Sequence, residues 1–172
     1  MAQPAKAAIA AALGLFGALW TGSAVAGHVI GYESGYPPGA IVISQSARAL
    51  YLILDSRTAI AYPVAVAKPG KEWSGPARVE AKFVEPAWSP PDSVKRDHPE
   101  LPDVIPGGSP HNPMGARAIT LDRDEIAIHG TTRAMRASIG AAASYGCIRM
   151  LNEDVIDLFD RVAVGAPVMM TR

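Results

Sequence analysis

Three apolar runs separated by short polar turns open the region after residue 40. They cover residues 41–44, 49–54 and 59–66, with turns at residues 45–48 and 55–58. Short apolar runs bounded by turn residues are typical of β-strands joined by hairpins. This region is therefore predicted to form a three-stranded meander. Because Pro63 cannot donate a ladder hydrogen bond, the third strand is expected to lie at a sheet edge or to contain a bulge.

The pattern further along predicts four more strands and one long helix. The strands are expected at residues 78–84, 118–121, 125–128 and 168–170. Asn152 is predicted to cap a helix that runs from Glu153 to about Val162. The apolar stripe of this helix consists of Val155, Ile156, Phe159 and Val162. The predicted fold class is mostly β, with one principal α-helix near the C-terminus.

A long proline-rich stretch follows the strand predicted at residues 78–84. It runs from residue 85 to residue 115, and its prolines disfavour regular structure. It nevertheless keeps the apolar side chains of Trp88, Leu101, Val104, Ile105 and Met114. Long loops inside compact domains are usually functional, so we expect a lid or a substrate wall. The alternative is a linker between two domains.

Residues 1–26 follow the plan of a secretory signal peptide. Lys6 lies in a weakly positive start, residues 9–20 are an apolar run, and Ala24-Val25-Ala26 forms an Ala-x-Ala cleavage pattern. The run is shorter than the about 20 residues of a membrane span, which argues against the alternative of an uncleaved anchor. We predict cleavage after Ala26, a mature domain of residues 27–172 and a periplasmic location.

Composition narrows the possible functions. The chain of 172 residues has a formal net charge of zero, from 16 basic and 16 acidic residues. No basic excess or charged run favours a nucleic-acid partner. Cys147 is the only cysteine, so no intramolecular disulfide can form. A lone thiol in an exported protein is either a reactive group or a small buried apolar side chain.

Cys147 follows His129 by 18 residues, and the two residues form a candidate catalytic pair. A thiol is a weak nucleophile until it loses its proton, and a nearby imidazole can accept that proton. Gly146 permits close backbone approach, and the amides of Tyr145, Gly146 and Cys147 are candidates for an oxyanion hole. No carboxylate adjoins His129 in the sequence, so the carbonyl of Gly130 is the candidate for orienting its ring.

The residues around this pair resemble the catalytic motif of the L,D-transpeptidases, the YkuD-type domain. The motif reads His-Gly-Thr at residues 129–131 and Ser-Tyr-Gly-Cys-Ile-Arg-Met at residues 144–150. Further similarity at residues 88–91, 115–118 and 152–155 extends the resemblance over nearly all of the mature chain. It implies an L,D-transpeptidase-type β-sandwich or barrel, with residues 27–172 as the catalytic domain. Many members have His where this chain has Tyr145, a variable position that is not the base.

The resemblance implies roles for individual residues. Cys147 is the implied nucleophile and His129 its general base. Ser144 matches the hydroxyl of the motif and Arg149 its basic residue, and both are expected to bind substrate. Arg117 is a further candidate for binding a carboxylate. The alternatives are a salt bridge for Arg149 and a hydrogen bond within the turn for Ser144.

No metal or cofactor is expected. A metal site made of His98, His111 and Cys147 lacks compact ligand spacing. Trp73 and Trp88 either line a substrate groove or pack against the long loop, and the sequence favours neither.

The activity implied by the resemblance is a pair of acyl transfers on peptidoglycan stem peptides. Cys147 is expected to attack the carbonyl at the L-centre of diaminopimelate and release terminal D-alanine. The thioester then passes to a second diaminopimelate, to a lysine of an outer-membrane lipoprotein, to a free D-amino acid or to water. Acylation by carbapenems is also implied. Two other classes stay open: a cysteine hydrolase of the wall, acting as amidase or carboxypeptidase, and a non-catalytic wall-binding protein.

Overall fold

The computed structural model of the protein describes residues 27–172, and the predicted signal peptide lies outside the described residues. The strands are β1 His28–Gly31, β2 Ile41–Ser44, β3 Ala49–Ile53, β4 Thr58–Pro63, β5 Val66–Ala67, β6 Gly75–Val84, β7 Arg117–Leu121, β8 Ala127–His129, β9 Ala142–Ser144, β10 Ile148–Arg149 and β11 Pro167–Thr171. The helices are α1 Asp92–Asp97, the 3-10 helix η1 Ala134–Ser138 and α2 Asn152–Arg161. Within residues 27–172, no helix is both long and apolar enough to cross a membrane.

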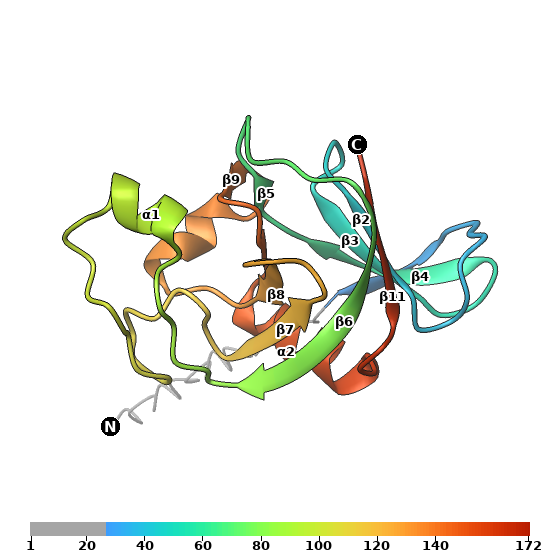
Figure 1. Cartoon of the computed structure of the whole chain (residues 1–172). Coiled ribbons are helices and arrows are strands. Elements are labelled where there is room, and N and C mark those ends of the chain that lie inside the picture. Colours follow the sequence, from blue (N-terminus) through green and yellow to red (C-terminus); the bar gives the residue numbers. More distant parts are fainter. Residues whose placement is uncertain (1–26) are drawn as a thin grey trace, which may run out of the picture.

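Nine strands form one bent sheet in the order β1-β4-β3-β2-β11-β6-β7-β8-β10, and β5 pairs with β9 separately (Figure 1). The predicted meander of β2, β3 and β4 is confirmed, and β1 adds to its outer side. The prediction that Pro63 marks an edge strand or a bulge is wrong, because β4 lies between β1 and β3 in regular register. Pro63 is tolerated because the pairing with β1 ends at Ala61.

Strand β6 joins the two halves of the sheet. Its first residues pair with β11 and its later ones with β7, and the β6–β7 register shifts between Val79 and Ala81. β7 and β8 then form a hairpin, and β10 adds to β8 in parallel. β8 and β10 are therefore neighbours in the sheet although residues 130–147 separate them in the sequence.

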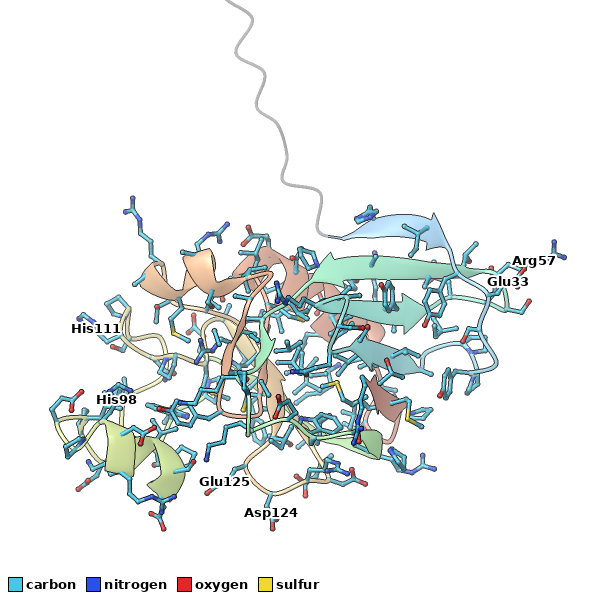
Figure 2. All side chains as sticks on the ribbon, turned by 90° about the horizontal axis from the view of Figure 1, so that it is seen from above. Glu33, Arg57, His98, His111, Asp124 and Glu125 are labelled. Atoms are coloured by element: carbon cyan, nitrogen blue, oxygen red, sulfur yellow. The ribbon has the colours of Figure 1, made fainter. Side chains whose placement is uncertain are left out.

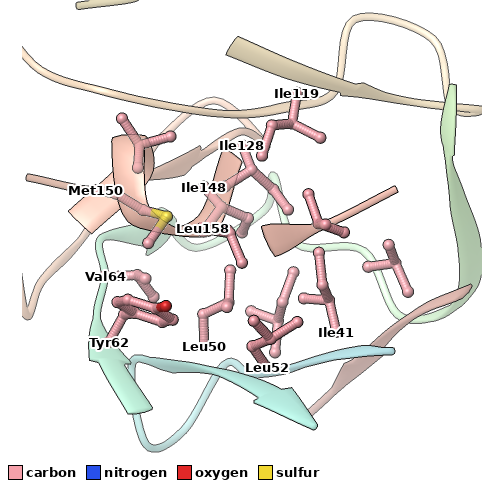
Figure 3. Packing of buried hydrophobic residues seen from close by; sticks show 14 of the residues in the cluster. Ile41, Leu50, Leu52, Tyr62, Val64, Ile119, Ile128, Ile148, Met150 and Leu158 are labelled. Atoms are coloured by element: carbon pink, nitrogen blue, oxygen red, sulfur yellow. The ribbon is translucent and has the colours of Figure 1, made fainter. Parts of the chain in front are cut away.

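The core lies inside the bend of the sheet, between the meander and helix α2 (Figure 3). Leu50 and Tyr62 approach it from the meander, Ile128 and Ile148 from β8 and β10, and Leu158 from the helix. All five side chains are fully buried. Because burial of one large aliphatic side chain contributes about 1.5–3 kcal/mol, this cluster holds the two halves of the sheet together.

Helix α2 confirms the prediction of one principal helix, with two corrections. Its buried apolar face consists of Val155, Leu158 and, just after its end, Val162, whereas Ile156 and Phe159 are only partly buried. The predicted cap is also wrong, because the helix begins at Asn152 and has no side-chain cap. The Asn152 side chain instead makes hydrogen bonds to residues outside the helix.

The proline-rich stretch between β6 and β7 is not wholly irregular, because it contains the short helix α1. Trp88 and Ile105 exchange backbone hydrogen bonds of 2.9 and 2.8 Å across it. The Asn112 amide group donates to the carbonyls of Pro86, Ile105 and Pro106. Because β6 and β7 pair directly, the stretch is an excursion from one sheet and not a linker between two domains.

Candidate active site

Strand pairing brings His129 and Cys147 together. His129 is the last residue of β8, and Cys147 directly precedes β10. The parallel register pairs Ile148 with Ile128 and Arg149 with His129. Because side chains alternate along a strand, the two isoleucines enter the core, whereas Cys147, Arg149 and His129 share the other face of the ladder.

A short hydrogen bond fixes the orientation of the His129 ring. Its Nδ1 donates to the carbonyl of Gly130 over 2.7 Å, where the orienting partner was expected. The other ring nitrogen, Nε2, is then the basic atom of the neutral ring. Burial, followed by the charge of Arg149, lowers the pKa of His129 to about 4, against the opposing effect of the Gly130 and Pro113 carbonyls. The ring is therefore a neutral base near pH 7.

The thiol of Cys147 rests against the turn between β7 and β8. Its Sγ donates to the carbonyl of Glu125 over 3.3 Å. Burial raises the pKa of the thiol, although the Ala127 backbone and the charge of Arg149 act in the opposite direction. Cys147 is thus a neutral thiol in the resting site, and its proton has to leave during the reaction. Figure 2 shows Glu125 beside Asp124 on this turn.

Ser144 holds the turn that precedes Cys147. It is 1% exposed, and its hydroxyl donates to the carbonyl of Cys147 over 2.5 Å while accepting the amide of Gly146 over 3.1 Å. Both bonds lie within the turn, as in the alternative considered for this residue. The prediction that Ser144 binds substrate is therefore not supported by the geometry.

The backbone of this turn leaves two amides for an oxyanion. Gly146 has φ 136°, and a Cβ there would lie 2.6 Å from a methyl carbon of Ile126, so this position requires glycine. Its amide is used by Ser144, which removes it from the predicted oxyanion hole. The amides of Tyr145 and Cys147 donate to no acceptor within residues 27–172.

The two candidate arginines lie on opposite faces of the sheet. Arg149 lies beside Cys147, and within residues 27–172 no carboxylate is within ion-pair distance of it.

Arg117 immediately precedes Ala118, the register partner of His129, so its side chain points to the other face. There it donates to the Ala116 carbonyl and lies 5.4 Å from the Phe159 ring. This placement does not support the prediction that Arg117 binds substrate.

Helix α2 anchors the loops around His129 through Asn152. The Asn152 Oδ1 accepts the amides of Ala116 and Thr131, each over 3.1 Å, and its Nδ2 donates to the Thr131 carbonyl over 3.0 Å. A Cβ on Gly130 would lie 2.1 Å from that Oδ1, so glycine is required for the contact. The sequence indicated Asn152 only as a cap, because the loops that it contacts are far from it in the chain.

Aromatic side chains border the nucleophile turn. The indole nitrogen of Trp73 donates to the Gly146 carbonyl over 3.0 Å, so this side chain contacts the nucleophile turn. The Tyr145 hydroxyl donates to Asp97, the last residue of α1, over 2.5 Å. Lys68 lies 3.6 Å from the centre of the Tyr145 ring and 3.6 Å from Asp97. The excursion is therefore fastened beside Cys147, although no sequence signal linked α1 to this turn.

The residues considered for a metal do not converge. Figure 2 shows His98 and His111 on the excursion, and His98 is within 3.3 Å of Glu100. Within residues 27–172, no three His, Cys, Asp or Glu side chains group as metal ligands.

The sequence is similar to those of proteins named as probable L,D-transpeptidases. Residues 38–170 match the YkuD family, described as the L,D-transpeptidase catalytic domain. The probable L,D-transpeptidase ErfK/SrfK of Escherichia coli (strain K12) is 36% identical over 140 residues, which cover 77% of this chain and 43% of that protein. The chain thus spans less than half the length of that relative.

Solved structures share the fold. L,D-transpeptidase 3 from Mycobacterium tuberculosis superposes with a TM-score of 0.61 at 17% identity, over 79% of this chain and 62% of that one. A Brucella melitensis protein named as a probable carnitine operon oxidoreductase is 41% identical, with a TM-score of 0.55 over 81% of this chain and 89% of that one. Because the family match spans residues 38–170, the chain belongs to the YkuD family of L,D-transpeptidase catalytic domains.

Proposed function

We propose that the protein is a cysteine acyltransferase of peptidoglycan, an L,D-transpeptidase with Cys147 as nucleophile and His129 as base. The observation that carries this proposal is the β8–β10 register, which gives the thiol and the oriented imidazole one face of the sheet. Family membership supports the reaction type. The donor is a stem peptide ending in D-alanine, and the acceptor is an amine.

In the first half-reaction, Nε2 of His129 takes the thiol proton as sulfur attacks the carbonyl carbon of the L-centre of diaminopimelate. The amides of Tyr145 and Cys147 donate to the oxygen that becomes negative. The C–N bond then breaks, and the imidazolium gives its proton to the departing amine of D-alanine. A thioester stays on Cys147.

In the second half-reaction, an acceptor amine attacks the thioester. His129 takes a proton from that amine, and the carbon–sulfur bond breaks as the thiolate leaves. The imidazolium then returns the proton to sulfur, which restores the neutral pair. The guanidinium of Arg149, which has no acidic partner in the described part of the chain, is available for a carboxylate of the substrate.

The proposal includes a periplasmic location, which rests on the leader pattern of residues 1–26. Peptidoglycan and the lysine of an outer-membrane lipoprotein, one of the acceptor amines considered, are both reached from that compartment. Expression of the full chain in a Gram-negative host, followed by fractionation and intact mass measurement, tests this location. The expected species is periplasmic and begins at Gly27, whereas an unprocessed chain in the cytoplasm contradicts the location.

The test of the chemistry is the intact mass of the mature protein after incubation with a carbapenem. We expect one covalent adduct on the wild type and none on Cys147→Ala. Folded, reduced wild type that stays unmodified would contradict the proposed nucleophile. Incubation with disaccharide tetrapeptides then separates transfer from hydrolysis. A new amide between two third-position residues, or to an added D-amino acid, supports the transferase, and tripeptide alone supports the hydrolase.

A further inference from the structure

The backbone nitrogen of Gly27, at the start of β1, faces a buried carboxylate. It lies 3.2 Å from Oδ1 of Asp154, which stands in the first turn of α2. Asp154 is 3% exposed, and its Oδ2 has no hydrogen-bond partner within residues 27–172. A buried carboxylate oxygen without a hydrogen-bond donor destabilises the fold. The Oδ2 of Asp154 is therefore expected to have a donor in the mature protein.

The space around Gly27 fits glycine and excludes other residues. Its φ is +61°, a conformation that side chains with a Cβ rarely adopt. A Cβ there would lie 2.5 Å from Ile60 and 2.6 Å from the Tyr62 ring. The position borders a hollow of about 600 Å³ whose wall includes His28, Leu151 and Asp154. The nitrogen of a glycine is therefore held against Asp154 in a shaped site.

We propose that Asp154 is a built-in receptor for the α-ammonium group that cleavage after Ala26 creates on Gly27. The proposal rests on the export that the proposed function includes. A signal peptidase and one water molecule break the Ala26–Gly27 amide: hydroxide joins the carbonyl carbon of Ala26, and a proton joins the nitrogen. The new amine then takes a proton from solvent, because its ordinary pKa is about 7.7–8.0.

The ammonium supplies what the site lacks. It carries three N–H donors where the amide carries one, so it can serve both oxygens of Asp154. It also supplies a positively charged partner to the Asp154 carboxylate, which forms no ion pair within residues 27–172. A buried charge is well tolerated when it is paired and hydrogen-bonded, and poorly tolerated when it is alone.

The charged groups near Asp154 do not replace that ammonium. Burial raises the pKa of Asp154, and the negative charges of Glu153 and Asp157 on α2 raise it further. The hydrogen bond from the Gly27 nitrogen lowers this pKa. Arg136 lowers it from η1 but is bound to Glu153 over 2.7 Å. On the other side, His28 and Arg48 line the hollow, and neither forms an ion pair with Asp154 within residues 27–172.

The ion pair would strengthen the end of α2 that supports the active site. Asp154 follows Asn152 by two residues, and Asn152 holds the amides of Ala116 and Thr131 next to the His129 loop. Removal of the leader would thereby stabilise the same helical turn that fixes the base. The processed chain is expected to be more stable than one carrying even a single extra residue.

The experiment compares two mature chains that differ by one residue. Residues 27–172 contain both sheets and the whole described core, so they are released from a cleavable fusion with either Gly27 or Ala26 first. Each chain is made with Asp154 and with Asp154→Asn, which keeps an acceptor for the nitrogen. The α-amine is titrated by NMR, and Tm is measured at pH 7.

The chain that begins with Gly27 is expected to have the higher Tm and an α-amine pKa at least about one unit above the ordinary value near 7.7. Asp154→Asn should return that pKa to its ordinary range. It should also lower Tm by about 4 °C more in the chain that begins with Gly27 than in the chain that begins with Ala26.

Equal Tm values and ordinary amine pKa values in the two chains with intact Asp154 would overturn the proposal, even if Asp154→Asn fails to fold. An equal effect of Asp154→Asn in both chains would overturn it as well. So would a periplasmic protein that begins at another residue. Carbapenem adducts are recorded on the same samples. If carbapenem adducts form but the pKa of the α-amine does not depend on Asp154, only this inference is overturned. If the pKa of the α-amine depends on Asp154 but no adduct forms, only the proposed acyltransferase activity is overturned.

Discussion

At the scale of single residues, the hydroxyl of Ser144 has a structural task. It accepts the amide of Gly146 and donates to the carbonyl of Cys147, so it closes the turn on both sides of the glycine. The two remaining amides of the turn, those of Tyr145 and Cys147, donate to no acceptor within residues 27–172. Ser144 therefore acts on the reaction through the shape of the turn.

Replacement of Ser144 by alanine should damage both stability and rate. It leaves the buried amide of Gly146 without an acceptor, so the free energy of unfolding in urea should fall by about 1–3 kcal/mol. The rate of carbapenem acylation should fall as well, because the turn no longer fixes the sulfur. The control is Ser46→Ala, which removes an exposed hydroxyl and should change stability by less than about 0.5 kcal/mol. Equal effects of the two substitutions would contradict this assignment.

At the scale of elements, α2 supports the active site from the core side of the sheet. Its buried face packs on the core, while the first residue of the helix, Asn152, contacts the loops before β7 and after β8. Gly130 lies directly against this side chain, and its carbonyl orients His129. The helix thereby connects core packing to the position of the base.

Two substitutions of Asn152 separate its acceptor from its donor. Asn152→Ala leaves the amides of Ala116 and Thr131 without a partner, so unfolding should become easier by about 2–4 kcal/mol, and acylation should slow. Asn152→Asp keeps the acceptor and loses only the donation to the Thr131 carbonyl, so its loss should be about 1 kcal/mol. Denaturant unfolding and the acylation rate check both values. Similar losses for the two variants would refute the role of the acceptor.

At the scale of the whole molecule, the buried imidazole makes stability depend on pH. The pKa of His129 is about 4 in the native state against 6.5 for an unperturbed histidine. Between these values the unfolded chain binds a proton that the native protein does not bind. Native stability should therefore decrease as pH falls from 6.5 to 4, by up to about 3 kcal/mol from this group alone.

Chemical denaturation from pH 4 to pH 7 checks this dependence in the wild type and in His129→Gln. The variant has no group that titrates in this window at that position, so its stability should change less with pH. The carboxylates of Asp55, Asp97 and Glu153, whose pKa values are lowered by hydrogen bonds, contribute to acid sensitivity equally in both proteins. Parallel pH profiles for the two proteins would show that His129 is not the buried neutral group.

The sequence by itself determined the elements whose signals are local. The meander follows from apolar runs between turn residues, and α2 follows from a helical period over ten residues, so both are present as predicted. The candidate pair of His129 and Cys147 also came from local motifs and their spacing. These signals are readable because each depends on residues within a few positions of one another.

Only the tertiary structure decided the features that depend on pairing between distant segments. The short strands β9 and β10 carry too few residues for a period to be visible, and they form because distant segments pair with them. The register of β7 with β8 places the Arg117 side chain on the face of the sheet opposite His129. The amide of Gly146 donates to the buried hydroxyl of Ser144 and so is not available to an oxyanion. Asn152 and Asp154 meet groups that only the folded chain brings near them, since long-range contacts leave no local pattern in the sequence.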